Sequence, residues 1–157
     1  MRIILLAMLL DAAWNQGPFG TWRMNPGRST FTGRPQPKSF ALRIEPHASG
    51  EVFTLEETRA DGRATTSSTI LYFDGRPRDF QDSVCLGSQS SRRLDEAAVE
   101  ILRRCNAGGW TIRFVRRVSA RAPELVLEIT EQQDGGRRFE HRLVLERQKS
   151  KQGRREP

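Results

Sequence analysis

Residues 19–31 read FGTWRMNPGRSTF and mark the point where regular structure is expected to begin. Gly20 and Trp22 form a G-x-W pair, and the turn signal NPG follows directly at 25–27. Beyond this stretch, apolar side chains recur at every second position, as in KSFALRIEP at 38–46. A period of two is typical of strands that bury one face. The stretch therefore predicts a first strand that carries one large aromatic ring.

The rest of the chain repeats this alternation, with turn chemistry between the apolar segments. Asp-Gly pairs at 61–62 and 74–75, and Asp-Gly-Gly at 134–136, are tight-turn signals. Further strands are predicted over 52–55, 64–73, 97–105, 110–119, 124–130 and 137–147. We expect an all-β fold, a single antiparallel up-and-down (lipocalin-like) β-barrel of about eight to ten strands, because such a meander must close to bury one face.

The G-x-W pair, together with a basic residue in the last strand, resembles the lipocalin pattern. In that pattern the tryptophan plugs one end of the barrel and an arginine packs across its ring, a cation–π contact. The resemblance implies these structural roles for Gly20, Trp22 and Arg147, with Arg142 as the alternative arginine.

The chain more closely resembles a group of exported bacterial proteins that have a lipocalin-like barrel and largely unknown function. The shared motifs are GTWRMN at 20–25, STF at 29–31, PKS at 37–39 and LERQ at 145–148. The resemblance covers about residues 18–148 and brings no known catalytic residue with it.

The two ends of the chain differ in composition from this central region. An apolar run at 3–10, followed by small residues, resembles a secretory signal peptide, with cleavage expected between residues 12 and 16. A buried N-terminal strand or helix, or a misassigned start, is the alternative. The division expected is a signal peptide or flexible segment at 1–17, the barrel at 18–148 and a disordered basic tail at 149–157. This predicts a periplasmic or secreted, monomeric protein.

The charge of the chain does not indicate a nucleic-acid-binding protein. Of the net +7, the last ten residues contribute +3, from four basic and one acidic side chain. Only three of the 26 basic residues are lysines. No apolar run approaches the roughly 18 residues of a membrane-spanning helix, so no membrane span is predicted.

The two cysteines, Cys85 and Cys105, are too far apart for a C-x-x-C site, and too few other ligands lie nearby for a metal. The sequence between them reads as a hairpin. Pairing Leu94 with Val99 puts Cys85 opposite Gly108, so a bulge or a small register change is needed to join the sulfurs. We predict a disulfide in an oxidising compartment; two independent thiols are the alternative.

Hydroxyl side chains on one strand are the clearest indication of a binding pocket. Residues 65–69 (TTSST) place hydroxyls on both faces, and we predict that the face of Thr66, Ser68 and Tyr72 contacts a ligand, together with Phe114 and the inward-facing His141. Plain β-propensity of threonine explains the pattern equally well. The arginine doublets 92–93, 103–104, 116–117 and 137–138 put one arginine inward and one outward, as a solvated face or as a rim that attracts anionic ligands.

No arrangement of nucleophile, base and orienting group is evident, so we predict no enzymatic activity and no cofactor. The prediction is non-enzymatic binding of a small apolar, amphipathic or anionic ligand inside the barrel. A structural or protein-interaction barrel with a filled core is the alternative, and an enzyme using His141 a third possibility.

Overall fold

The computed structural model describes residues 17–119 and 123–149. All but the last residue of the predicted signal peptide (1–17) and all but the first of the predicted basic tail (149–157) lie outside these residues. The described residues form eleven strands: β1 (Gly20–Met24), β2 (Thr30–Phe31), β3 (Ser39–His47), β4 (Gly50–Thr58), β5 (Ala64–Leu71), β6 (Arg78–Gln81), β7 (Leu86–Arg93), β8 (Ala98–Cys105), β9 (Trp110–Val118), β10 (Glu124–Gln133) and β11 (Arg138–Arg147). Two short 3-10 turns, Pro26–Arg28 and Ala107–Gly109, complete the described elements.

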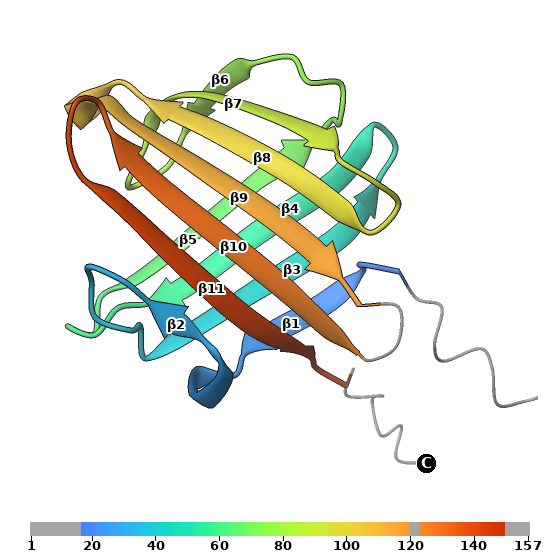
Figure 1. Cartoon of the computed structure of the whole chain (residues 1–157). Coiled ribbons are helices and arrows are strands. Elements are labelled where there is room, and N and C mark those ends of the chain that lie inside the picture. Colours follow the sequence, from blue (N-terminus) through green and yellow to red (C-terminus); the bar gives the residue numbers. More distant parts are fainter. Residues whose placement is uncertain (1–16, 120–122, 150–157) are drawn as a thin grey trace, which may run out of the picture.

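The strands form one antiparallel sheet that curls on itself, with β8–β11 in the near layer of Figure 1 and β1, β3, β4 and β5 behind them. Their order is β5-β4-β3-β1-β11-β10-β9-β8-β7-β6, so almost every strand pairs with its neighbour in sequence. The two-residue β2 pairs only with β11 and lies off this path, and it raises the number of strands above the expected range. The all-β, antiparallel prediction is confirmed.

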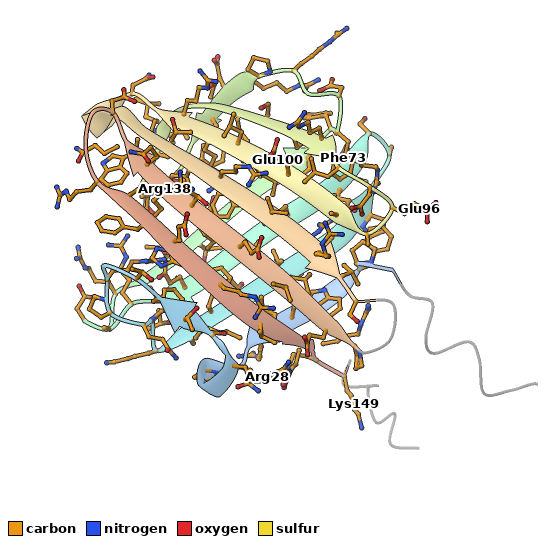
Figure 2. The ribbon with its side chains drawn as sticks, in the orientation of Figure 1. Arg28, Phe73, Glu96, Glu100, Arg138 and Lys149 are labelled. Atoms are coloured by element: carbon orange, nitrogen blue, oxygen red, sulfur yellow. A yellow bond between two sulfur atoms is a disulfide. The ribbon has the colours of Figure 1, made fainter. Side chains whose placement is uncertain are left out.

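The curled sheet has a seam between its two edge strands, β5 and β6. The links that join the two sides there come mainly from β7: Gln89 Nε2 donates to Thr69 Oγ1 at 3.0 Å, and the Phe73 amide donates to Ser91 Oγ at 3.1 Å. Phe73, labelled in Figure 2, lies where β5 has ended, and its φ of 59° marks the change in chain direction. A small hollow of about 190 Å³ lies along this seam, and Tyr72 is among its lining residues.

A hydrophobic core of buried side chains surrounds Trp22 in one half of the interior. Trp22 on β1 is fully buried, and its Nε1 donates to the carbonyl of Pro18 at 2.8 Å. Arg147, its direct partner on β11, lies with its guanidinium carbon 4.3 Å from the centre of the indole ring. Arg142, the alternative arginine, is exposed on the other face of β11. Gly20 has a φ of +124°, which a larger residue rarely adopts.

A buried ion pair crosses the same filled half. Arg116 on β9 donates to Glu51 on β4 through two bonds, of 2.7 and 3.3 Å, and the side chains are only 2% and 3% exposed. Arg117, the second member of the doublet, is exposed and pairs with Asp95.

Arginines on the outer surface pair with acidic side chains of neighbouring strands. Glu100, labelled in Figure 2 on β8, accepts hydrogen bonds from Arg92 and Arg113 at 2.7 and 2.6 Å. Glu100 itself is largely buried, whereas Arg92 and Arg113 are 61% and 46% exposed, so solvent partly screens these two pairs.

Candidate functional site

The other half of the interior is hollow. A cavity of about 450 Å³ opens where the β4–β5 turn, the segment before β3 and the β6–β7 loop converge. Its apolar wall comes from four strands, β3, β4, β9 and β10, and includes Phe40, Leu55, Ile112, Phe114 and Ile129. A volume of this size and an apolar wall with a few polar groups are typical of small-molecule sites.

The register of β4 and β5 decides which hydroxyls reach the cavity. Leu55 lies opposite Ser67 and Glu57 opposite Thr65, and all four side chains line the cavity. Successive residues of a strand point to opposite faces, so the intervening side chains point outward. The inward face of β5 is therefore the odd-numbered one.

Three of the predicted ligand-contacting residues lie outside this cavity. Thr66 and Ser68 are exposed on the outer face of β5, where Ser68 Oγ lies 2.9 Å from Thr54 Oγ1. Tyr72 follows β5 on the same outer side, with the guanidinium carbon of Arg78 3.9 Å from its ring centre. The prediction chose the face of Thr66, Ser68 and Tyr72, and the structure brings the opposite face of β5 into the cavity.

The two other predicted residues face the interior, and only one of them lines the cavity. Phe114 does so and is 5% exposed. His141 is buried behind the wall, with its ring centre 5.1 Å from that of Phe31, and its Nδ1 accepts the Thr32 amide at 3.2 Å. His141 does not line the cavity itself but contacts a residue that does: its Nε2 lies 3.8 Å from Glu131 Oε1.

Glu131 is held in its charged form by the groups around it. The adjacent His141 has the largest effect, and it and Arg34 together outweigh burial, so the pKa of Glu131 lies below its ordinary value of 4.5. Arg34 also pairs with Glu57 at 3.0 Å, which joins two acidic residues of the cavity wall through one guanidinium.

Arg103 on β8 is the most buried charge in the cavity wall, with 4% of its surface exposed. Its Nε donates to Gln89 at 2.9 Å, and its Nη1 lies 3.4 Å from Asp82 Oδ2. The guanidinium carbon lies 4.1 Å from the ring centre of Phe80 and 5.0 Å from that of Phe114. Burial lowers the pKa of Arg103 to about 10, since removal from water penalises the charged form.

From the sequence, one arginine of the 103–104 doublet was expected to face the barrel interior, but which of the two was not predicted. The structure buries Arg103 and leaves Arg104 exposed. Thr65 and Ser67 also face inward but were not predicted as ligand contacts. One feature of the sequence could have indicated their face, since the apolar Leu71 lies on it at the end of the strand.

A disulfide joins Cys85, at the cavity wall, to Cys105, with 5.0 Å between the Cα atoms. The hairpin register differs by one residue from the expected one, because Arg93 rather than Leu94 lies opposite Val99. Gly87 therefore faces Cys105, and Cys85 lies just before β7, from where it bonds to Cys105.

The disulfide anchors the loop that presents Asp82 to Arg103. Asp82 Oδ1 accepts the amides of Val84 and Cys85 at 2.8 and 2.7 Å, which leaves Oδ2 to face the guanidinium. The bond between the sulfurs thus fixes one side of the charged wall of the cavity.

Within residues 17–119 and 123–149, no group of three or more His, Cys, Asp or Glu side chains is arranged to hold a metal ion. The helices of the described part of the chain include none long and apolar enough to cross a membrane.

The chain matches no protein-family model and no curated protein sequence. Among solved structures, it is similar to zebrafish ileal bile acid-binding protein in complex with cholic acid, with a TM-score of 0.50 and 12% identity over 83% of this chain and 98% of that one. It is also similar to a variant of the fluorescent protein UnaG, with a TM-score of 0.50 and 16% identity over 82% of this chain and 94% of that one. At these identities the comparisons establish the fold alone: this chain is a lipocalin-like antiparallel β-barrel.

Proposed function

We propose that this protein binds a small apolar or amphipathic molecule in the cavity and performs no chemistry on it. The observation that carries the proposal is the hollow half of the barrel, about 450 Å³ in volume and walled by aliphatic and aromatic side chains. Burying apolar ligand surface there would contribute roughly 25 cal/mol per Å². The similar zebrafish barrel was solved with cholic acid, an amphipathic molecule, which supports this class of function by analogy.

The competing function is a structural or protein-interaction barrel whose interior is filled by its own side chains. The half around Trp22 fits that description, since its core side chains are fully buried. The half around Phe114 differs, because Phe114 and its neighbours belong to the same hydrophobic core but also border a cavity of about 450 Å³. This contrast between two halves of one barrel supports ligand binding.

The test is displacement or uptake of N-phenyl-1-naphthylamine, a neutral apolar fluorophore that brightens when it leaves water. We expect the wild-type protein to bind the dye and Thr65→Trp to lose most of that binding, since the larger ring would occupy the cavity. Thr66→Trp is the matched control, because its side chain lies on the outer face of the same strand. Equal dye binding by the two variants, or none by the wild type, would contradict the proposal.

We also propose that the protein is an exported monomer that works in an oxidising compartment, periplasmic or extracellular. The Cys85–Cys105 disulfide supports this, because such bonds persist where thiols are not kept reduced. Mass spectrometry of the protein recovered from a periplasmic fraction should give a chain that has lost its first residues and two hydrogens. A reduced, uncleaved chain confined to the cytosol would overturn the proposal.

A further inference from the structure

Hydrogen-bond donors without acceptors gather around the cavity. Among the described residues, six buried side-chain nitrogen or oxygen atoms have no hydrogen-bond partner, and four of them belong to residues that line the cavity. These are Arg34 Nε, Arg59 Nε, Arg103 Nη2 and Ser67 Oγ. A buried donor without a partner costs about 1–3 kcal/mol. Three guanidinium donors and a hydroxyl therefore favour an occupant that supplies acceptor oxygens.

Arg103 is the most deeply buried of these arginines, and its positive charge is only partly balanced by its neighbours. One of its two hydrogen bonds goes to the neutral Gln89, and the other, at 3.4 Å, goes to Asp82. Asp82 shares its own charge with the backbone amides of the β6–β7 loop. The lowered pKa of Arg103 agrees with a buried cation that gains from a further anion.

Ser67 belongs to the same side of the cavity. Ser67 and Thr69 share the inward face of β5, and Gln89 connects Thr69 to Arg103 by one hydrogen bond at each end. Polar groups thus extend from β5 across the seam to β8, and of these Ser67 and Arg103 line the cavity. The apolar wall of Ile112, Phe114 and Ile129 lies on β9 and β10.

Resting on the function proposed above, we infer that the cavity takes an amphipathic carboxylic acid with its carboxylate against Arg103 Nη2 and the Ser67 hydroxyl, and its apolar body against Phe114 and its neighbours. A carboxylate is favoured over a neutral oxygen because charge-assisted hydrogen bonds are about twice as strong. Asp82 and Glu131 also line the cavity and oppose a second negative charge. Arg59 offsets part of this repulsion, since no carboxylate of the described residues lies within ion-pairing distance of it.

The experiment compares decanoate with decanol, which share an alkyl chain and differ in the head group, by displacement of N-phenyl-1-naphthylamine at pH 8. We expect the wild-type protein to bind decanoate about 10- to 100-fold more tightly than decanol, the range of a hydrogen bond to a charged group. Arg103→Met should remove this preference and leave decanol binding within about threefold. Arg104→Met, the outward member of the doublet, should keep it.

Each outcome decides the inference. Equal affinity of the wild type for acid and alcohol overturns the carboxylate site and leaves ligand binding intact. Binding of neither compound, with no dye uptake, overturns the proposed function as well. A preference that survives Arg103→Met overturns the role of Arg103. If Arg103→Met does not fold, the wild-type comparison and Ser67→Ala, expected to weaken decanoate severalfold more than decanol, decide instead; an unchanged ratio in Ser67→Ala overturns the site.

Discussion

The buried ion pair between Glu51 and Arg116 should be far more costly to break than the exposed pair one residue away. Arg116 and Glu51 are 2% and 3% exposed, whereas Arg117 and Asp95 are 54% and 49% exposed. Removing one partner of a buried pair leaves a charge that neither water nor protein compensates. Arg116→Met is therefore expected to lower the free energy of unfolding by about 3–5 kcal/mol. Arg117→Met should cost at most about 1 kcal/mol.

Thermal and urea unfolding, followed by circular dichroism, measure this difference. For a chain of this size, a loss of about 3–5 kcal/mol corresponds to a fall of roughly 6–20 °C in Tm. The double variant Glu51→Leu/Arg116→Met should recover most of the loss, because no charge is left buried and well-packed apolar groups replace the pair at little net cost. The two single losses would then add up to much more than the loss of the double variant.

Two results would refute this reasoning. One is a cost for Arg116→Met no larger than that for Arg117→Met, which would mean that solvent reaches the pair. The other is additive single losses, which would mean that the two charges do not compensate each other.

Three further expectations follow from the structure. Replacing Cys85 and Cys105 with serine should lower the free energy of unfolding by about 3 kcal/mol, as for a loop of this length; a urea midpoint unchanged from that of the oxidised wild type would contradict this. Trp22→Ala should cost about 3–5 kcal/mol, because it empties the core beneath Arg147, and a loss under about 1 kcal/mol would show that the ring is not a core element. The folded pKa of Glu131 is lowered, so its contribution to stability is present above the unfolded value near 4.5 and is lost as the pH falls through the folded value; urea unfolding between pH 3 and 6 should show a shallower decline for Glu131→Gln, and parallel curves would count against it.

Much of the architecture could be predicted from local patterns in the sequence. Alternation of apolar and polar residues and the Asp-Gly turns predicted the antiparallel meander, because a strand's period of two and a tight turn are both local properties. The tryptophan of the first strand and an arginine at the end of the last strand were paired through the resemblance to lipocalins, and they lie opposite each other in the β1–β11 pairing.

Choices between two nearly equal faces could not be made from sequence. On β5, the faces of Ser67 and Ser68 have similar composition, and only pairing with Leu55 on β4 shows which one enters the cavity. The hairpin between the cysteines was expected one residue out of register, because its turn residues allow either pairing and only the full ladder of β7 and β8 selects one.

The sequence by itself determined the class of the fold and the antiparallel order of neighbouring strands, since both depend on residues close together in the chain. Only the tertiary structure decided that one half of the barrel is filled and the other hollow. It also decided that Arg103 and Arg116, both first members of an arginine doublet, have different surroundings. Arg116 meets Glu51 from a strand 65 residues away, whereas Arg103 lies at the cavity wall with neutral Gln89 and, at 3.4 Å, Asp82 as its partners. The physical reason is that a buried charge takes its character from the partners that the closed barrel brings to it, and none of these lies beside it in the sequence.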